Sequence, residues 1–119
     1  MLYSTDLEIR PLIRLFRALG EETRLRIVAL LCHGELCVCH IESALALNQS
    51  TASRQLGILK TAGVVDRRRD GTWVYYRIVA QQDAAVQRVL AIVTERFGAE
   101  NVLKRDHAKL KKTCGPCAP

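Results

Sequence analysis

Two short helical segments separated by a tight turn are the feature that most constrains what this chain can fold into. Apolar residues recur at helical spacing at about residues 38–45 and again at about 50–62. Leu47-Asn48-Gln49 lies between them, which leaves a turn of about three to four residues. This spacing is typical of a helix-turn-helix, in which the second helix enters the major groove of DNA. The segment therefore predicts a DNA-binding unit.

The rest of the chain predicts the elements that complete such a unit. Apolar periodicity indicates further helices at about residues 6–19, 21–32 and 82–97. Residues 64–79 instead carry β-forming residues around Asp70-Gly71, a dipeptide typical of a two-residue hairpin turn. The expected fold is mostly α with one β-hairpin, in the order α-α-α-α-β-β-α, a homodimeric winged helix-turn-helix. We expect residues 1–98 to form the DNA-binding and dimerisation domain, and residues 99–119 a basic, flexible tail that contains cysteines.

Polar side chains crowd the first turn and a half of the second helix of the pair, while its apolar positions face the core. Gln can pair with adenine edges, Arg with guanine, and Ser or Thr with bases or phosphates, although Ser and Thr are also common helix caps. The predicted hairpin adds three consecutive arginines, which cannot all face the same way because strand side chains alternate. The candidate DNA-contacting residues are Gln49, Ser50, Thr51, Ser53, Arg54, Gln55, Arg67, Arg68 and Arg69.

The distribution of charge agrees with this interpretation. The formal net charge is +6, and residues 50–80 hold six Lys/Arg against two Asp/Glu, with a smaller surplus in residues 99–119. A basic block beside a helix-turn-helix predicts double-stranded operator DNA as the partner, although a solvated face would carry the same residues. Binding through these residues should depend strongly on salt.

Two apolar stripes exceed what one domain of this size can hide. The last helix carries a continuous stripe, and the first helix is similarly apolar. A two-fold dimer would bury both and place two recognition helices one turn of DNA apart. The predicted dimer-interface residues are Leu12, Phe16, Val86, Val89, Leu90 and Val93.

The composition disfavours several other classes of protein. No apolar run approaches the roughly 18–20 residues of a membrane span, and the first residues lack a signal-peptide pattern. Five cysteines is an odd number, so reduced thiols in the cytoplasm are expected rather than a secreted disulfide scaffold. An enzyme with nucleophilic cysteines would need an anion-binding loop, and none is visible, so we expect a regulator and not an enzyme.

Four segments carry further motifs. They are Glu22-Thr23-Arg24-Leu25-Arg26-Ile27-Val28, Gly34-Glu35-Leu36-Cys37-Val38-Cys39, Gln49-Ser50-Thr51-Ala52-Ser53-Arg54-Gln55-Leu56 and Arg68-Arg69-Asp70-Gly71-Thr72-Trp73-Val74-Tyr75-Tyr76-Arg77. Together they resemble the ArsR/SmtB family of metal-responsive winged-helix repressors, over about residues 10–97. The motif Glu-Leu-Cys-Val-Cys is similar to that of the arsenic-responsive branch. The resemblance implies a homodimer that represses an operon and leaves DNA when arsenite or antimonite binds, with no organic cofactor.

The resemblance makes Cys37 and Cys39 the central candidates for the inducer site. Trivalent arsenic is soft and prefers thiolates, typically three of them. In a regular helix these two positions are separated by about 200° of rotation, so one ion can bridge them only where the helix start is unwound. We expect binding there to distort the first helix of the pair, shift the second and weaken DNA binding, with a coupling of about 1–3 kcal/mol.

The third ligand has several candidates. The arsenic-responsive branch often places a cysteine three residues after the second one, where this chain has Glu42, a poor arsenic ligand. Cys32 is the first candidate, with a small buried hydrophobe as its alternative role. Cys114 and Cys117, at CxxC spacing in the tail, could also reach in, or two thiols could suffice for a methylated arsenical. A thiol-based redox sensor, another metal sensor and a DNA-binding domain with structural cysteines are the alternative functions.

Overall fold

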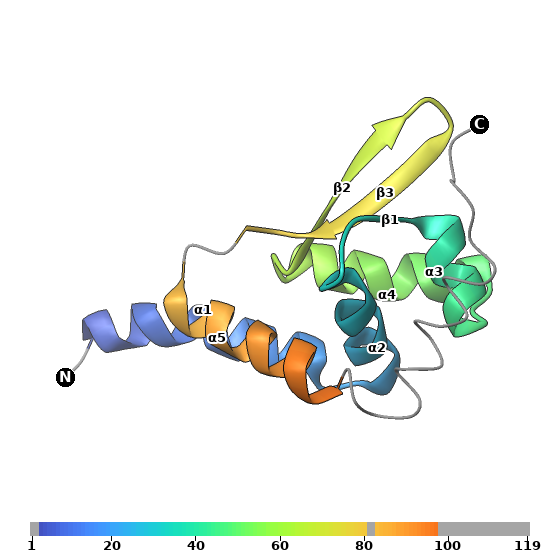
Figure 1. Cartoon of the computed structure of the whole chain (residues 1–119). Coiled ribbons are helices and arrows are strands. Elements are labelled where there is room, and N and C mark those ends of the chain that lie inside the picture. Colours follow the sequence, from blue (N-terminus) through green and yellow to red (C-terminus); the bar gives the residue numbers. More distant parts are fainter. Residues whose placement is uncertain (1–2, 81–82, 98–119) are drawn as a thin grey trace.

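The computed structural model describes residues 3–80 and 83–97, so the predicted tail at residues 99–119 lies outside the described residues. Its elements follow in the order α1 (Tyr3–Leu19), α2 (Glu22–Leu31), β1 (Leu36–Cys37), α3 (Val38–Leu45), α4 (Gln49–Thr61), β2 (Val65–Asp70), β3 (Trp73–Ile78), α5 (Ala84–Ile92) and the π-helical turn η1 (Val93–Phe97). This confirms the predicted order of four helices, a hairpin and a final helix, to which the structure adds the short strand β1 (Figure 1).

The three strands form one antiparallel sheet in the order β1-β3-β2. The hairpin of β2 and β3, hereafter the wing, extends away from the helices (Figure 1). Its connection is Gly71-Thr72, and Gly71 has a φ of +63°, a conformation that favours glycine. Strand β1 pairs with β3 through Leu36 and Cys37, so it joins the start of α3 to the wing.

Local side-chain chemistry sets the boundaries of the helix pair. Helix α3 ends at Ala46, which adopts a left-handed conformation with a φ of 54°. Helix α4 begins after Asn48, whose Oδ1 accepts a hydrogen bond of 2.8 Å from the backbone N–H of Thr51. A cap of this kind satisfies one of the donors that a helix start leaves unpaired. The short turn between the two helices therefore follows directly from these residues.

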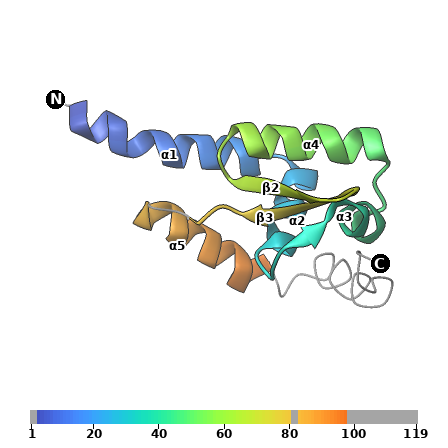
Figure 2. The same ribbon diagram turned by 90° about the horizontal axis from the view of Figure 1, so that it is seen from above.

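An aliphatic core holds α4 against the other helices. The largest fully buried side chains include Leu15, Ile27, Ile41, Leu56 and Leu59, which come from α1, α2, α3 and α4. Each side chain of this size contributes roughly 1.5–3 kcal/mol through its removal from water. Figure 2 shows α1 and α4 on one side of the wing strands and α5 on the other. The core thus fixes α4 and leaves its outer face open to solvent.

Candidate nucleic-acid interface and cysteine site

The first turns of α4 present a polar, exposed face. Gln49, Ser50, Ser53 and Arg54 are exposed, and Thr51 is half-buried. These side chains are of the types that read base edges or bind phosphates. Five of the six α4 residues that the sequence singled out therefore remain available to DNA.

Gln55 is different, because it faces the interior. Only 6% of it is exposed, and its Oε1 accepts a hydrogen bond of 2.9 Å from Nη1 of Arg24. The same guanidinium donates from Nε to the carbonyl oxygen of Ala18 at 2.7 Å. A side chain held in this way points its amide into the protein, so Gln55 is a weaker candidate for contact with DNA than the other five residues, and its contact stays a prediction. Arg24 joins α2 to the end of α1 and to α4, a role that the sequence did not reveal.

The three arginines of the wing divide between its two faces. Arg67, Arg68 and Arg69 are all exposed, and the alternation of a strand places the first and third on one face and the second on the other. Arg68 donates two hydrogen bonds to the carboxylate of Glu35, at 2.9 Å and 2.8 Å. Its guanidinium also lies 4.4 Å from the centre of the Tyr75 ring. Arg67 and Arg69 are therefore the better candidates for contact with DNA.

The cysteine pair lies where β1 becomes α3. Cys37 is the last residue of β1 and precedes the first turn of α3, with an extended backbone (φ −68°, ψ 146°). Cys39 belongs to the first turn of α3, and the Sγ atoms of the two residues are 2.9 Å apart. The expected obstacle of opposite helix faces does not arise, because Cys37 lies outside the helix. The two sulfurs converge without any unwinding of α3.

The third ligand is not brought to this pair by the residues described. No group of three His, Cys, Asp or Glu side chains with metal-binding geometry occurs within residues 3–80 and 83–97. Cys32 ends α2 and packs, half-buried, against the core. Burial raises the pKa of its thiol, and a hydrogen bond with Thr94 opposes that rise. Cys114 and Cys117 lie outside the described residues.

Strand β1 connects the cysteine pair to the wing. Cys37 is the register partner of Tyr75 in β3, and Leu36 is the partner of Tyr76. Glu35, immediately before β1, forms the ion pair with Arg68 of β2. The hydrogen bonds from Arg68 are the main cause that lowers the pKa of the Glu35 carboxyl. The sequence offered no signal for this connection beyond the presence of the charges.

The predicted dimer interface is only partly exposed in one protomer. Phe16 is 55% exposed, but Val86, Leu90 and Val93 are buried in the protomer's own core, and Leu12 and Val89 are half-buried. The three buried residues offer little surface to a partner, and their place in an interface stays a prediction. Among the residues of α1 and α5 whose burial is described, Ile9, Ile13 and Ile92 are further large apolar side chains that are exposed.

The helix pair, the open face of α4 and the basic wing define a winged helix-turn-helix DNA-binding protein. The profile of the family described as "Bacterial regulatory protein, arsR family" matches residues 21–67. The chain belongs to this family. Its membership confirms the predicted fold, the DNA partner and the prediction of a regulator rather than an enzyme.

Three known proteins illustrate the similarity. The HTH-type transcriptional regulator MJ1325 of Methanocaldococcus jannaschii is 44% identical over 82 residues, which cover 68% of this chain and 89% of that protein. The arsenical resistance operon repressor of Escherichia coli is 48% identical over 67 residues, or 56% of this chain and 57% of that protein. The homodimeric winged helix-turn-helix domain of Mb0332 from Mycobacterium bovis has a TM-score of 0.65 at 33% identity, covering 82% of this chain and 90% of that one.

One further observation concerns membranes. Within residues 3–80 and 83–97, no helix is both long enough and apolar enough to span a bilayer.

Proposed function

We propose that this chain is a homodimeric repressor that releases operator DNA when arsenite or antimonite binds the thiolates of Cys37 and Cys39. The observation that carries the proposal is the 2.9 Å separation of the two Sγ atoms at the junction of β1 and α3. One ion can be held by both sulfurs where the chain already brings them together. The similarity to the E. coli arsenical resistance operon repressor supports the choice of inducer.

The donors suit a soft metalloid better than a hard cation. Thiolate ligands favour soft ions, whereas carboxylates favour hard ones such as magnesium. At neutral pH arsenite is As(OH)3, so each thiol that becomes a ligand displaces one hydroxide, which leaves as water together with the thiol's proton. Glu42, in the position where a third cysteine would follow in α3, adds no thiolate.

For the third sulfur we propose Cys114 or Cys117 in preference to Cys32. Cys32 packs against the apolar core at the end of α2, and burial raises the pKa of its thiol. Within the described residues, Cys32 also belongs to no group of three His, Cys, Asp or Glu side chains that could hold a metal ion, so no such group joins it to Cys37 and Cys39. The two tail cysteines are the remaining thiols of the chain.

Two routes lead from Cys37 to the DNA-contacting elements. The first passes through α3, whose buried Ile41 belongs to the same core as Leu56 of α4. The second passes through β1, which pairs with β3 of the wing. Glu35, the residue before β1, also forms an ion pair with Arg68 of β2. A ligand that moves Cys37 therefore acts on the recognition helix and on the wing together.

The dimer proposed here uses the exposed apolar face of α1 and α5. Ile9, Ile13, Phe16 and Ile92 present large apolar side chains to solvent in the isolated protomer. An isologous contact between two copies would cover these groups and set the recognition helices at two successive half-sites.

The direct test is a titration of the DNA complex with arsenite. A fluorescent duplex selected by the wild-type chain from a random pool is bound under strict reduction, and its anisotropy is followed as arsenite or antimonite is added. We expect release from the wild type and retention by Cys37→Ser and Cys39→Ser, while Cys32→Ser behaves as the wild type. Release by peroxide but not by arsenite would instead favour a redox sensor, and release from the double serine variant would refute the assignment of the site.

X-ray absorption of the arsenite-loaded protein tests the third ligand. We expect three sulfurs in the wild type and in Cys32→Ser, and two when both Cys114 and Cys117 are replaced by serine. A loss of one sulfur in Cys32→Ser would assign the third position to that residue instead.

A further inference from the structure

We propose that a groove between α1 and α4 binds the phosphate backbone of the operator, on the side of the recognition helix opposite the wing. The groove has a volume of about 810 Å³. Its lining includes the side chains of Arg14, Arg17, Arg24, Arg54, Ile58 and Ala62. The inference rests on the DNA-binding role of the chain and is independent of which inducer it takes.

The lining of the groove carries four arginines and no acidic residue. Arg24 is occupied by its hydrogen bonds to Ala18 and Gln55. Arg14, Arg17 and Arg54 are exposed. Within residues 3–80 and 83–97, no carboxylate forms an ion pair with any of these three. Three guanidinium groups without counter-charges produce a positive potential that attracts an anion.

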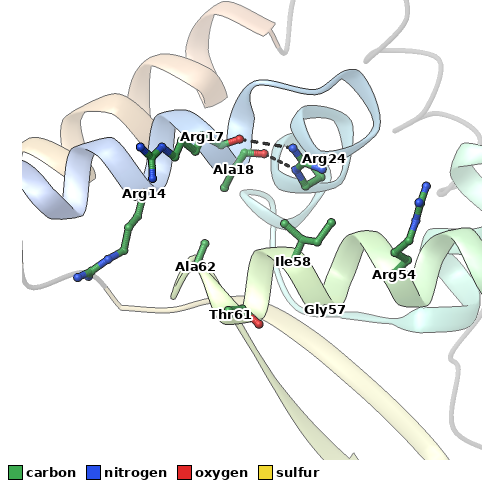
Figure 3. Close-up of a pocket in the computed structure, with 9 residues that line it drawn as sticks. All are labelled: Arg14, Arg17, Ala18, Arg24, Arg54, Gly57, Ile58, Thr61 and Ala62. Atoms are coloured by element: carbon green, nitrogen blue, oxygen red, sulfur yellow. Dashed lines mark hydrogen bonds between the residues drawn. The ribbon is translucent and has the colours of Figure 1, made fainter.

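The shape of the site fits an extended anion better than a small one. Figure 3 shows Arg14 and Arg54 at opposite ends of the groove, with Ala62 and Ile58 between them. A single small anion could be reached by only one end of such an arrangement. A nucleic-acid backbone carries one charge for roughly every 1.7 Å of duplex axis, so it can contact several arginines in turn.

The groove is continuous with the recognition surface already described. Arg54 lies on the exposed face of α4 and also lines the groove. A helix in the major groove, which is about 12 Å wide, has a sugar-phosphate backbone on each side. The wing lies on one side of α4 and α1 on the other (Figure 3). Arg67 and Arg69 of the wing can then contact one backbone, while Arg14 and Arg17 contact the other.

The exposed arginines of α1 would contribute affinity without sequence preference. Contacts to phosphate position a protein on the duplex, whereas contacts to base edges distinguish sequences. Each phosphate contact also releases counterions, which changes the slope of log affinity against log salt by about 0.9. These two properties separate a backbone contact from a base contact.

The test measures duplex affinity as a function of salt for the full-length chain and for Arg14→Gln, Arg17→Gln and the double variant. The two probes are a duplex selected by the wild type from a random pool and an unrelated duplex of equal length. Arg14→Lys and Arg17→Lys keep the charge, and Arg96→Gln removes one exposed charge outside the groove. Sedimentation equilibrium of every variant measures dimerisation separately.

We expect each glutamine variant to weaken binding to both duplexes by a similar factor and to reduce the salt slope by about 0.9, with about twice that change in the double variant. The lysine variants should restore the slope, and Arg96→Gln should leave it near the wild-type value. An unchanged slope, or a loss of affinity fully explained by weaker dimerisation, would overturn the proposal. If the wild type selects no duplex at all, the DNA-binding role itself is refuted. If arsenite fails to release the DNA, the proposed inducer is refuted, but the salt-slope test of the groove is unaffected.

Discussion

One guanidinium links α4 to α1 and α2, and its contribution to stability can be measured. Arg24 donates hydrogen bonds at 2.7 Å to the carbonyl of Ala18 and at 2.9 Å to Oε1 of the buried Gln55. Replacement by Met keeps the aliphatic stem but removes these two donors and the third, longer one from Nη2 to the carbonyl of Arg17 at 3.4 Å. Hydrogen bonds that involve a charged group contribute about 1.5–3 kcal/mol each, so we expect Arg24→Met to lower the free energy of unfolding by roughly 3 kcal/mol.

A double-mutant cycle isolates the contact between α2 and α4. Gln55→Met removes the acceptor, and the two substitutions together should cost about 1–2 kcal/mol less than the sum of their separate effects. The free energies come from urea denaturation at one fixed protomer concentration, because dimerisation contributes to apparent stability. Arg54→Met, an exposed arginine of the same α4, is the matched control and should change stability by less than about 0.5 kcal/mol.

The result that would refute this reasoning is additivity. If the cost of the double variant equals the sum of the two single costs to within about 0.3 kcal/mol, the bond between Arg24 and Gln55 does not stabilise the fold. The same variants also connect stability to function, because an α4 that has lost this bond should bind operator DNA more weakly even where it remains folded. Operator affinity at saturating dimer concentration measures that effect.

Two further predictions concern the wing and the dimer. The pKa of Glu35 is lowered in the folded protein, so its ion pair with Arg68 stabilises the wing above the carboxyl's ordinary pKa near 4.5. That stabilisation is lost as the pH falls through the lower pKa of the folded state. Glu35→Gln should remove this acid-side change in the NMR shifts of the wing, and should reduce arsenite-induced release without abolishing arsenite binding. Ile13→Asp and Ile92→Asp, at exposed apolar positions, should convert the dimer to a folded monomer in sedimentation equilibrium, whereas Leu90→Asp, at a buried position, should unfold the chain by circular dichroism; a dimer that persists in both isoleucine variants would exclude that face as the interface.

The sequence was sufficient for the elements whose signals are local. Helix α3 spans Val38–Leu45, the range that apolar periodicity predicts, and the turn that follows it is as short as predicted. The wing was expected from β-forming residues around the turn dipeptide Asp70-Gly71; β2 and β3 occur in that segment, but the two-residue connection lies one position later, at Gly71-Thr72. Periodicity and turn chemistry act over a few residues, so a single chain displays them directly.

The polar contacts that the sequence did not reveal join residues that are distant in sequence. Gln55 faces inward because Arg24, 31 positions earlier, binds it. Arg68 binds Glu35, 33 positions earlier, and this contact shows which of the three arginines faces away from the other two. The stripe of α5 shows the same limit, because periodicity indicates which face is apolar but not whether the protomer or a partner covers it.

The two-residue strand β1 has the largest consequence for mechanism, although it carries no periodic signal. It ends the extended backbone at Cys37, one residue before α3, and so allows two sulfurs at positions i and i+2 to meet. It also makes Cys37 a register partner of the wing. A coupling of about 1–3 kcal/mol corresponds to a change of 5–150-fold in DNA affinity, and a ligand at this junction can divide it between α4 and the wing. Neither element then has to move far, because the losses of DNA-binding free energy at α4 and at the wing add. Half of the coupling free energy at each of the two elements gives the whole effect.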